Sequence, residues 1–345
     1  MATQQLQGAV PFSIAHELQQ FRLLELPQDL VELLDAPNPP MYAPLRFPLR
    51  RSQLPNNSQK PAYAVLCTPH KTFQLRQVQT SNSLFVTRPT DEAHGNQESP
   101  VPTTRAVASC AATLELHPSD ASPIALLQQT LPFYDAVDGD VYASANRRRK
   151  ADIFPHLPFS DAECEHAWRT VMAFEHHGSS YRPSASTLAQ LWKSVNAAAL
   201  AEGVKLDGQF LTRDVVDPVA EEGHPESLVR AVLHYLAADE HDHDPVWSCL
   251  DRAKTVQFVA KTLLDAKRDG PDYLTADFLD AWKDALPEAW RALAELTAID
   301  GVYELPSSTT IRLKGLGVAA TQSETPAAKP SARKWHDKFG RSRKR

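Results

Sequence analysis

The spacing of the apolar residues changes once along this chain, near Ser122, and the change restricts the chain to folds that contain both sheet and helix. Before Ser122 the apolar residues alternate as they do in strands, within residues 62–68, 72–78, 83–87 and 107–116. After Ser122 they recur at the spacing of amphipathic helices. The 345 residues leave room for more than one domain. The pattern therefore predicts an α+β protein in which the strands come first and the helices follow.

Glycine is scarce in this chain, with 12 glycines against 27 prolines. Loops that hold a phosphate need glycines where backbone N–H groups approach the anion, and no glycine here precedes a lysine. Gly315 and Gly317 lack the third glycine of a dinucleotide-binding turn, and no G-x-S-x-G elbow occurs. These observations argue against nucleotide-hydrolysing enzymes and α/β-hydrolases. We therefore expect a protein with no catalytic residues and no cofactor.

Two features raise the question of a metal site. Residues 239–244 (D-E-H-D-H-D) carry ligand side chains, but they are adjacent in sequence and precede Pro245. A solvated loop is the favoured interpretation, adventitious metal binding is the second, and a metal hydrolase built on His241 and His243 is the remote alternative. The four cysteines are too far apart for C-x-x-C metal pairs, and we expect them to be small core residues. They are Cys67, Cys110, Cys164 and Cys249.

The strands of the first 120 residues are too few to make a stable sheet of their own. A short helix is expected to begin near Gln28, and a proline-rich connection follows at residues 36–61. Edges of strands that stay unpaired promote aggregation, and so few strands cannot close a barrel. We therefore expect residues 1–120 to form a β-rich barrel module that partner subunits complete.

After Ser122 the chain repeats one plan at intervals of roughly 65 residues, three helices and then a hairpin, which is the order of a winged helix. The predicted units are residues 121–183, 184–253 and 254–314. Residues 315–345 follow as a flexible linker and a basic tail. The sequence thus predicts three tandem winged-helix domains behind the β module.

Local signals place individual helices within these units. Ser160 opens a capping box, and the helix that it starts is expected to continue to a glycine stop at Gly178. The pair His176-His177 would then lie in the last turn of that helix, where a cation suits the helix dipole. Four tryptophans fall on apolar helical stripes and are expected in the core. They are Trp168, Trp192, Trp282 and Trp290.

Formal charge is distributed unevenly, with a net charge of −1 for residues 1–120, −11 for 121–330 and +6 for 331–345. An acidic body repels DNA unless its basic groups are segregated, so we expect DNA binding to be weak and independent of base sequence. Two basic segments could contact phosphates. The residues concerned are Arg147, Arg148, Arg149 and Lys150 in the body, and Arg333, Lys334, Arg341, Arg343, Lys344 and Arg345 in the tail.

Other interpretations of both basic segments stay open. The segment at 147–150 is equally typical of a solvated loop or a nuclear import signal. In the tail, Trp335 and Phe339 are four residues apart, on one face of a helix. That spacing favours a peptide that docks on a protein over aromatic rings that stack on bases.

Several motifs resemble those of the sister chromatid cohesion protein DCC family. They are F-R-L-L-E-L-P at 21–27, A-V-L-C-T-P-H-K-T-F-Q-L-R-Q-V-Q-T-S-N-S-L-F-V at 64–86, W-x-x-x-L-P-E at 282–288 and R-K-W at 333–335. The resemblance covers residues 12–335 and is strongest in the first 90. The proline-rich segment at 37–61 and the basic insertion at 144–150 are not part of the pattern.

The resemblance implies a nuclear, non-ATPase accessory subunit of the alternative, chromosome-transmission-fidelity form of replication factor C. The β module would join the small accessory subunit and the C-terminal end of the large clamp-loader subunit. The winged helices would contact DNA, and the assembly would hold DNA polymerase epsilon near the loader of the PCNA ring. Taken with the predicted strands, the resemblance indicates a set of partner-binding residues in which Phe73 and Leu75 are the anchors. The set is Phe21, Leu23, Leu66, Thr68, Phe73, Leu75, Leu84 and Phe85.

A rival interpretation from another class remains. The helical units could belong to a chromatin or transcription scaffold in which winged helices bind only protein. No apolar run reaches the ~18 residues of a membrane span, so neither interpretation involves a membrane.

Overall fold

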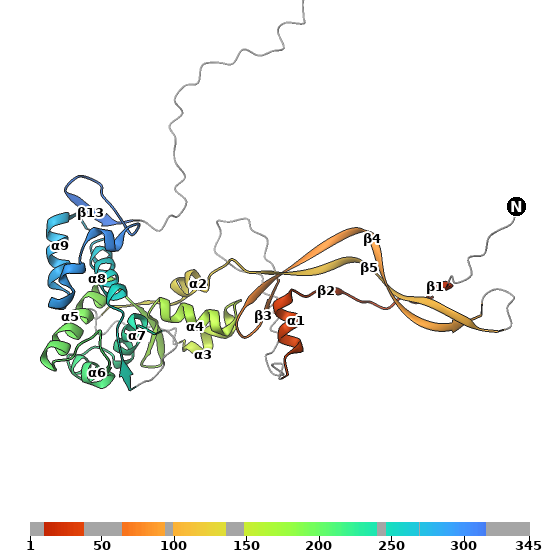
Figure 1. Cartoon of the computed structure of the whole chain (residues 1–345), viewed down its shortest axis with the longest axis horizontal. Coiled ribbons are helices and arrows are strands. Elements are labelled where there is room, and N and C mark those ends of the chain that lie inside the picture. The colour runs from red at the N-terminus through yellow and green to blue at the C-terminus, as the bar shows by residue number, and fades with distance from the viewer. Residues whose placement is uncertain are drawn as a thin grey trace, which may run out of the picture.

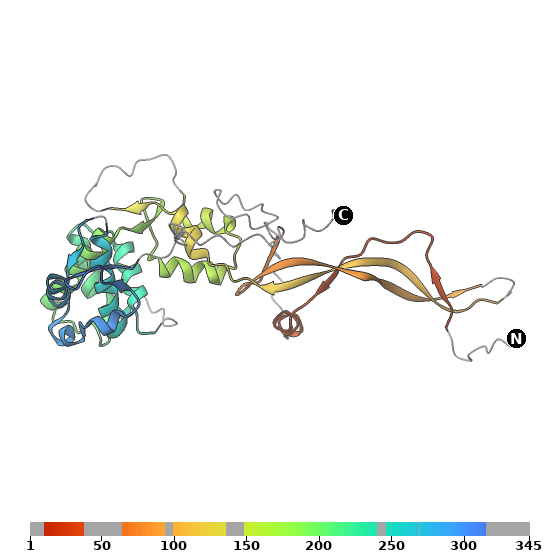
Figure 2. The same ribbon diagram turned by 90° about the horizontal axis from the view of Figure 1, so that it is seen from above.

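The computed structural model describes residues 10–37, 64–93, 99–135, 148–239, 246–268 and 270–314. A long β arm projects from a helical body, and β1 lies toward the far end of the arm (Figures 1 and 2). The described residues form helices together with one five-stranded and several smaller sheets, so the mixed α+β class is confirmed. The predicted barrel is not closed within the described residues, because the strands form an open sheet.

The arm is an antiparallel pair of long strands, β4 (Thr72–Glu92) and β5 (Val101–Pro118). Their register runs from Phe73 opposite Pro118 to Glu92 opposite Val101, with two irregularities on the way. The strands predicted at 72–78 and 83–87 are therefore one strand, and of the predicted loop at 89–105 the residues 89–92 and 101–105 are strand. The prediction was wrong there because Gln79, Ser81 and Asn82, between the two apolar runs, are polar and exposed. No core faces them, so no alternation marks them as strand.

Three shorter strands border this pair. β3 (Ala64–Cys67) pairs antiparallel with the start of β4, while β1 (Phe12–Ile14) and β2 (Leu23–Glu25) pair parallel with β5. The sheet order is β1-β5-β4-β3, with β2 also on β5.

The base of the arm holds a small core of its own. Helix α1 (Gln28–Asp35) begins where the sequence predicts, directly after Pro27. Its buried Leu30 packs with Leu66, Phe73 and Leu116 from the three strands at the base.

The first unit of the body has a separate core, which includes Leu127, Cys164 and Trp168. The capping box at Ser160 is confirmed, but the helix ends at Thr170. His176 lies in a strand rather than in a last helical turn, and His177 has a left-handed φ of 49° in the turn that follows. The elements are α2 (Pro123–Thr130), β6 (Phe133–Tyr134), α3 (Lys150–Ile153), η1 (Phe154–His156), α4 (Asp161–Thr170), β7 (Phe174–His176) and β8 (Ser179–Pro183).

The second and third units share one hydrophobic core. Trp192 of the second unit donates its indole N–H to the carbonyl of Ala285 in the third, at 2.8 Å. The elements are α5 (Ala185–Ala201), β9 (Phe210–Leu211), α6 (Thr212–Glu221), α7 (Glu226–Leu236) and β10 (Trp247–Ser248), then α8 (Arg252–Ala266), β11 (Tyr273–Leu274), α9 (Thr275–Asp284), η2 (Glu288–Leu293), η3 (Leu296–Ile299), β12 (Tyr303–Glu304) and β13 (Thr310–Leu313).

In each unit a two-residue strand follows the first helix and pairs with a strand near the end of the unit. The strand orders are β6-β8-β7, β10-β9 and β11-β13-β12. The sequence does not predict these first strands, because two residues are too few to show a period. The four tryptophans expected in the core are buried there. Cys67, Cys110 and Cys164 are buried as expected, while Cys249 is half-buried.

Candidate partner and nucleic acid interfaces

The two edges of the arm differ. The edge of β5 is paired by the chain itself at two places, with β1 at Thr104–Ala106 and with β2 at Thr113–Glu115. The opposite edge, on β4, is paired with β3 only from Thr72 to Leu75. Among the described residues, no strand pairs with that edge from Arg76 to Glu92. The arm therefore presents one long row of backbone hydrogen-bonding groups to the surroundings.

Apolar side chains are exposed on the arm. Leu84 and Phe85 of β4 are each 47% exposed, and the ring of Phe85 meets that of Phe12 edge to face with centroids 6.0 Å apart. Phe21 is exposed between the two N-terminal strands, and its carbonyl accepts a hydrogen bond from the Cys110 thiol. Ile14 and Val78 are also exposed. The sequence analysis missed Phe12 and Ile14, although the alternation of Phe12-Ser13-Ile14 is the signal of an edge strand.

The predicted partner-binding residues separate into two groups. Phe21, Leu84 and Phe85 are exposed, and Leu23 and Thr68 are half-buried. The remaining three belong to the core at the base of the arm: Leu66 and Phe73 are buried, and Leu75 packs against them.

Phe73, the predicted partner anchor, is thus a core residue of the free chain. Its side chain is 1% exposed, because α1 covers the face of the strand that the sequence pattern left open. Whether Phe21, Leu84 and Phe85 contact a partner stays a prediction.

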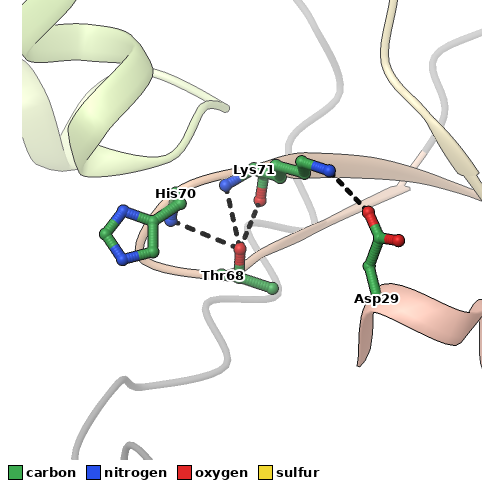
Figure 3. A network of polar contacts seen from close by, with 4 residues as sticks. All are labelled: Asp29, Thr68, His70 and Lys71. Carbon is green, nitrogen blue, oxygen red and sulfur yellow. Dashed lines mark hydrogen bonds and ion pairs between the residues drawn. The ribbon is translucent and has the colours of Figure 1, made fainter. Parts of the chain in front are cut away.

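The turn at the base of the arm is fixed by its own polar groups (Figure 3). The Thr68 hydroxyl accepts the N–H of Lys71 at 2.9 Å and donates to the carbonyl of Lys71 at 3.0 Å. The Lys71 ammonium pairs with Asp29 of α1, and this hydrogen bond lowers the pKa of the Asp29 carboxyl. Both side chains are exposed, so the pair orients α1 and adds little stability.

The predicted basic segment is only partly available for phosphate contact. Arg147 lies outside the described residues. Lys150 is occupied, because its ammonium bonds to Glu165 at 2.7 Å and lies 5.3 Å from the centre of the Trp168 ring. Arg148 and Arg149 are exposed and form no ion pair with the described residues. The Ser180 N–H donates to the carbonyl of Arg148 at 2.9 Å, which fixes this segment beside β8.

The six tail residues of the DNA-binding prediction also lie outside the described residues. They are Arg333, Lys334, Arg341, Arg343, Lys344 and Arg345. Residues 240–245 of the acidic and histidine-containing loop lie outside them too. In the part of the chain that the structure describes, no three His, Cys, Asp or Glu side chains come close enough to hold a metal ion.

A groove of about 980 Å³ lies between the first and second units. Trp168, Phe174 and Trp247 contribute aromatic surface to its walls. Its charged side chains are of both signs, which does not suit a phosphate backbone. They are Lys150, Arg169 and Arg230 against Glu165, Glu175 and Asp239.

The pKa values of two side chains next to these surfaces, the half-buried His176 and the buried Cys164, are shifted. Burial lowers the pKa of His176 on β7, and its neighbour His177 lowers it further. Burial also raises the pKa of the Cys164 thiol to about 12, with the acidic residues at the start of α4 adding to the effect. His176 is therefore disfavoured as a cation, and Cys164 is an inert thiol.

Fold and surface together define an α+β protein with an open-edged arm on a helical body. Within the described ranges, every helix is too short or too polar to span a bilayer. A comparison with curated proteins gives no match. The family model for sister chromatid cohesion protein Dcc1 matches residues 21–319.

The chain therefore belongs to the Dcc1 family. Membership gives it a role in sister chromatid cohesion, in a family of accessory subunits rather than of known enzymes. The resemblance that the N-terminal motifs indicate is confirmed.

Proposed function

We propose that this chain is a non-catalytic, nuclear adaptor of the alternative replication factor C clamp loader, acting in DNA replication and sister chromatid cohesion. Its arm binds the small accessory subunit and the C-terminal end of the large one. Its body faces DNA and DNA polymerase epsilon while the loader places PCNA. The observation that carries the proposal is the open edge of β4.

The length of that edge is the first support. β4 has 21 residues, and β3 pairs with four of them. At about 3.3 Å per residue, the remaining edge extends over roughly 55 Å. A free edge of this length is a template for another strand, and strand addition is a general way for one chain to bind another.

The faces of the arm give the second support. Away from its base the sheet has no described helix or second sheet against it, and side chains such as Leu84 and Phe85 stay exposed. A sheet needs a second layer to bury its apolar face. A partner that adds strands and closes the sheet would supply both the layer and the missing backbone pairs, at about 25 cal/mol per Å² of apolar area buried.

Co-expression tests the proposal directly. The full chain, produced together with the two accessory subunits, is expected to co-purify and to elute with them as one peak in gel filtration. If the chain elutes alone, as a monomer indifferent to both subunits, the adaptor function is wrong. When polymerase epsilon is added to the purified assembly, the gel-filtration peak is expected to shift to a larger apparent size.

We further propose that the three units of the body are winged helices that contact DNA weakly. The support is the element order, in which a short strand after the first helix pairs with the strand that ends the unit. Such units present helices and hairpins to DNA. Arg148 and Arg149, beside the β7–β8 hairpin, are the described cations best placed for phosphates.

Replacing Arg148 and Arg149 together with alanine is expected to weaken DNA binding and to reduce its salt dependence. For each phosphate that the variant no longer neutralises, the slope of log affinity against log salt falls by about 0.7–0.9. Fluorescence anisotropy of labelled duplex and single-stranded DNA, titrated at several salt concentrations, measures the slope. Replacing Lys193 and Lys205, two exposed lysines of the second unit, is the matched control.

An unchanged slope in the arginine variant would show that the phosphates bind elsewhere on the chain. No measurable affinity of the wild-type chain at physiological salt would favour the scaffold that binds only protein.

A further inference from the structure

The hydroxyl of Thr72 joins the arm to the body. Thr72 is the first residue of β4, and its side chain is 2% exposed. Its Oγ1 accepts the backbone N–H of Ser160 at 2.8 Å and donates to the carboxylate of Glu163. Ser160 and Glu163 are the two residues of the capping box that starts α4. A residue of the arm therefore completes the cap of a helix in the body.

Two further hydrogen bonds surround this contact. The N–H of Ala162, in the first turn of α4, donates to the carbonyl of Pro69 in the β3–β4 turn at 3.2 Å. The N–H of Ser119, just after β5, donates to the carbonyl of Thr72 at 2.9 Å. Both strands of the arm are thus fixed at the same point, next to the connection that leads into α2.

The joint restrains the arm because the N–H of Ala162 takes its acceptor from the arm rather than from its own helix. The first N–H groups of a helix lack intrahelical acceptors, and here the turn of the arm supplies the acceptor for Ala162. The hydroxyl of Thr72 is shielded from water, so separating it from Ser160 and Glu163 leaves a buried polar group without these partners, whereas the N–H of Ser160 keeps the Glu163 carboxylate as an acceptor at 3.1 Å. A tilt of the arm would break several of these bonds together.

We propose that Thr72 is a positioning residue that locks the arm and the first helical unit into one rigid body. The lock belongs to the free chain and does not depend on what the arm binds. Its consequence is that anything held by the arm keeps a fixed position relative to α4.

Hydrogen exchange of the wild-type chain tests the lock without any substitution. The amide of Ala162 is expected to exchange at least 100-fold more slowly than in an unfolded peptide when followed by NMR. Its acceptor, the carbonyl of Pro69, lies in the arm, so an arm that detached would expose this amide. Exchange of the Ala162 amide at the unfolded-peptide rate would overturn the proposal.

Variants at Thr72 test whether the arm keeps a fixed direction relative to the body. Thr72→Val keeps the shape of the side chain and removes the hydroxyl, whereas Thr72→Ser keeps the hydroxyl. Single-molecule FRET measures the distance between the arm and the body, with dyes attached to p-acetylphenylalanine at the exposed positions 88 and 200. We expect one narrow distribution for wild type and Thr72→Ser, and a broad one for Thr72→Val. A distribution as narrow as wild type in a folded Thr72→Val refutes the lock; if that variant does not fold, the exchange rates decide.

Discussion

Trp282→Ala is expected to destabilise the second and third helical units together, by about 3–5 kcal/mol, the usual cost of removing a large aromatic side chain from a core. Trp282 is 0% exposed and stacks on Phe278 with ring centroids 5.5 Å apart. Its indole N–H donates to the carbonyl of Val256 at 3.0 Å. The substitution therefore removes packing on α9 and the side-chain hydrogen bond that ties α9 to α8.

The effect should extend to the second unit because the two units have one core. Helix α8 packs against α5, and the hydrogen bond from Trp192 to Ala285 crosses the boundary predicted between residues 253 and 254. One shared core predicts one cooperative transition for residues 184–314.

Urea unfolding of the full chain, followed by tryptophan fluorescence and circular dichroism, measures the loss. Trp247→Ala is the matched control, since that side chain is 42% exposed and its removal should cost less than about 1 kcal/mol. Two separate transitions, only one of them shifted by Trp282→Ala, would show that the units unfold independently.

The parts of the fold that were predictable from sequence are those fixed by neighbouring residues. Pro27 sets the start of α1, and Ser160 with Glu163 sets the start of α4, because a cap acts within one turn. Trp282 lies on an apolar stripe of the right period, and its burial follows from that stripe.

Contacts between distant segments were not predictable in the same way. Phe73 alternates like a residue that faces a partner, and only the packing of α1 shows that its partner is the chain itself. Thr72 carries no signal, since its role depends on the capping box of α4, 88 positions away from it at Ser160. The continuous arm was also missed, because a sheet without a core on either face needs no alternation.

The second large effect concerns the arm. Leu84→Asp combined with Phe85→Asp is expected to abolish co-purification with the accessory subunits, weakening binding by about 100-fold or more. Both side chains are 47% exposed, so burial by a partner contributes about half of the value for a fully exposed side chain, roughly 0.7–1.5 kcal/mol each, and each 1.4 kcal/mol is tenfold in affinity. A carboxylate placed there must also lose its water, which adds to the penalty.

The choice of residues keeps binding separate from folding. Phe73→Asp would put a charge in the core at the base of the arm, so lost binding could not be told from an unfolded arm. Leu84 and Phe85 are already in contact with water and lie outside that core. The double variant is therefore expected to keep the circular dichroism spectrum and melting temperature of the wild-type chain.

Leu200→Asp combined with Leu305→Asp is the matched control, since both leucines are exposed and lie on the body. Gel filtration after co-expression should show the control in the complex and the arm variant outside it. Both variants replace two exposed apolar side chains with carboxylates. The control therefore distinguishes loss of a specific binding surface from a general effect of making the surface less apolar. If the arm variant stays in the complex, the partner does not cover this part of β4. The composite sheet would then have to be built on another surface of the arm, where β1 and β2 now lie.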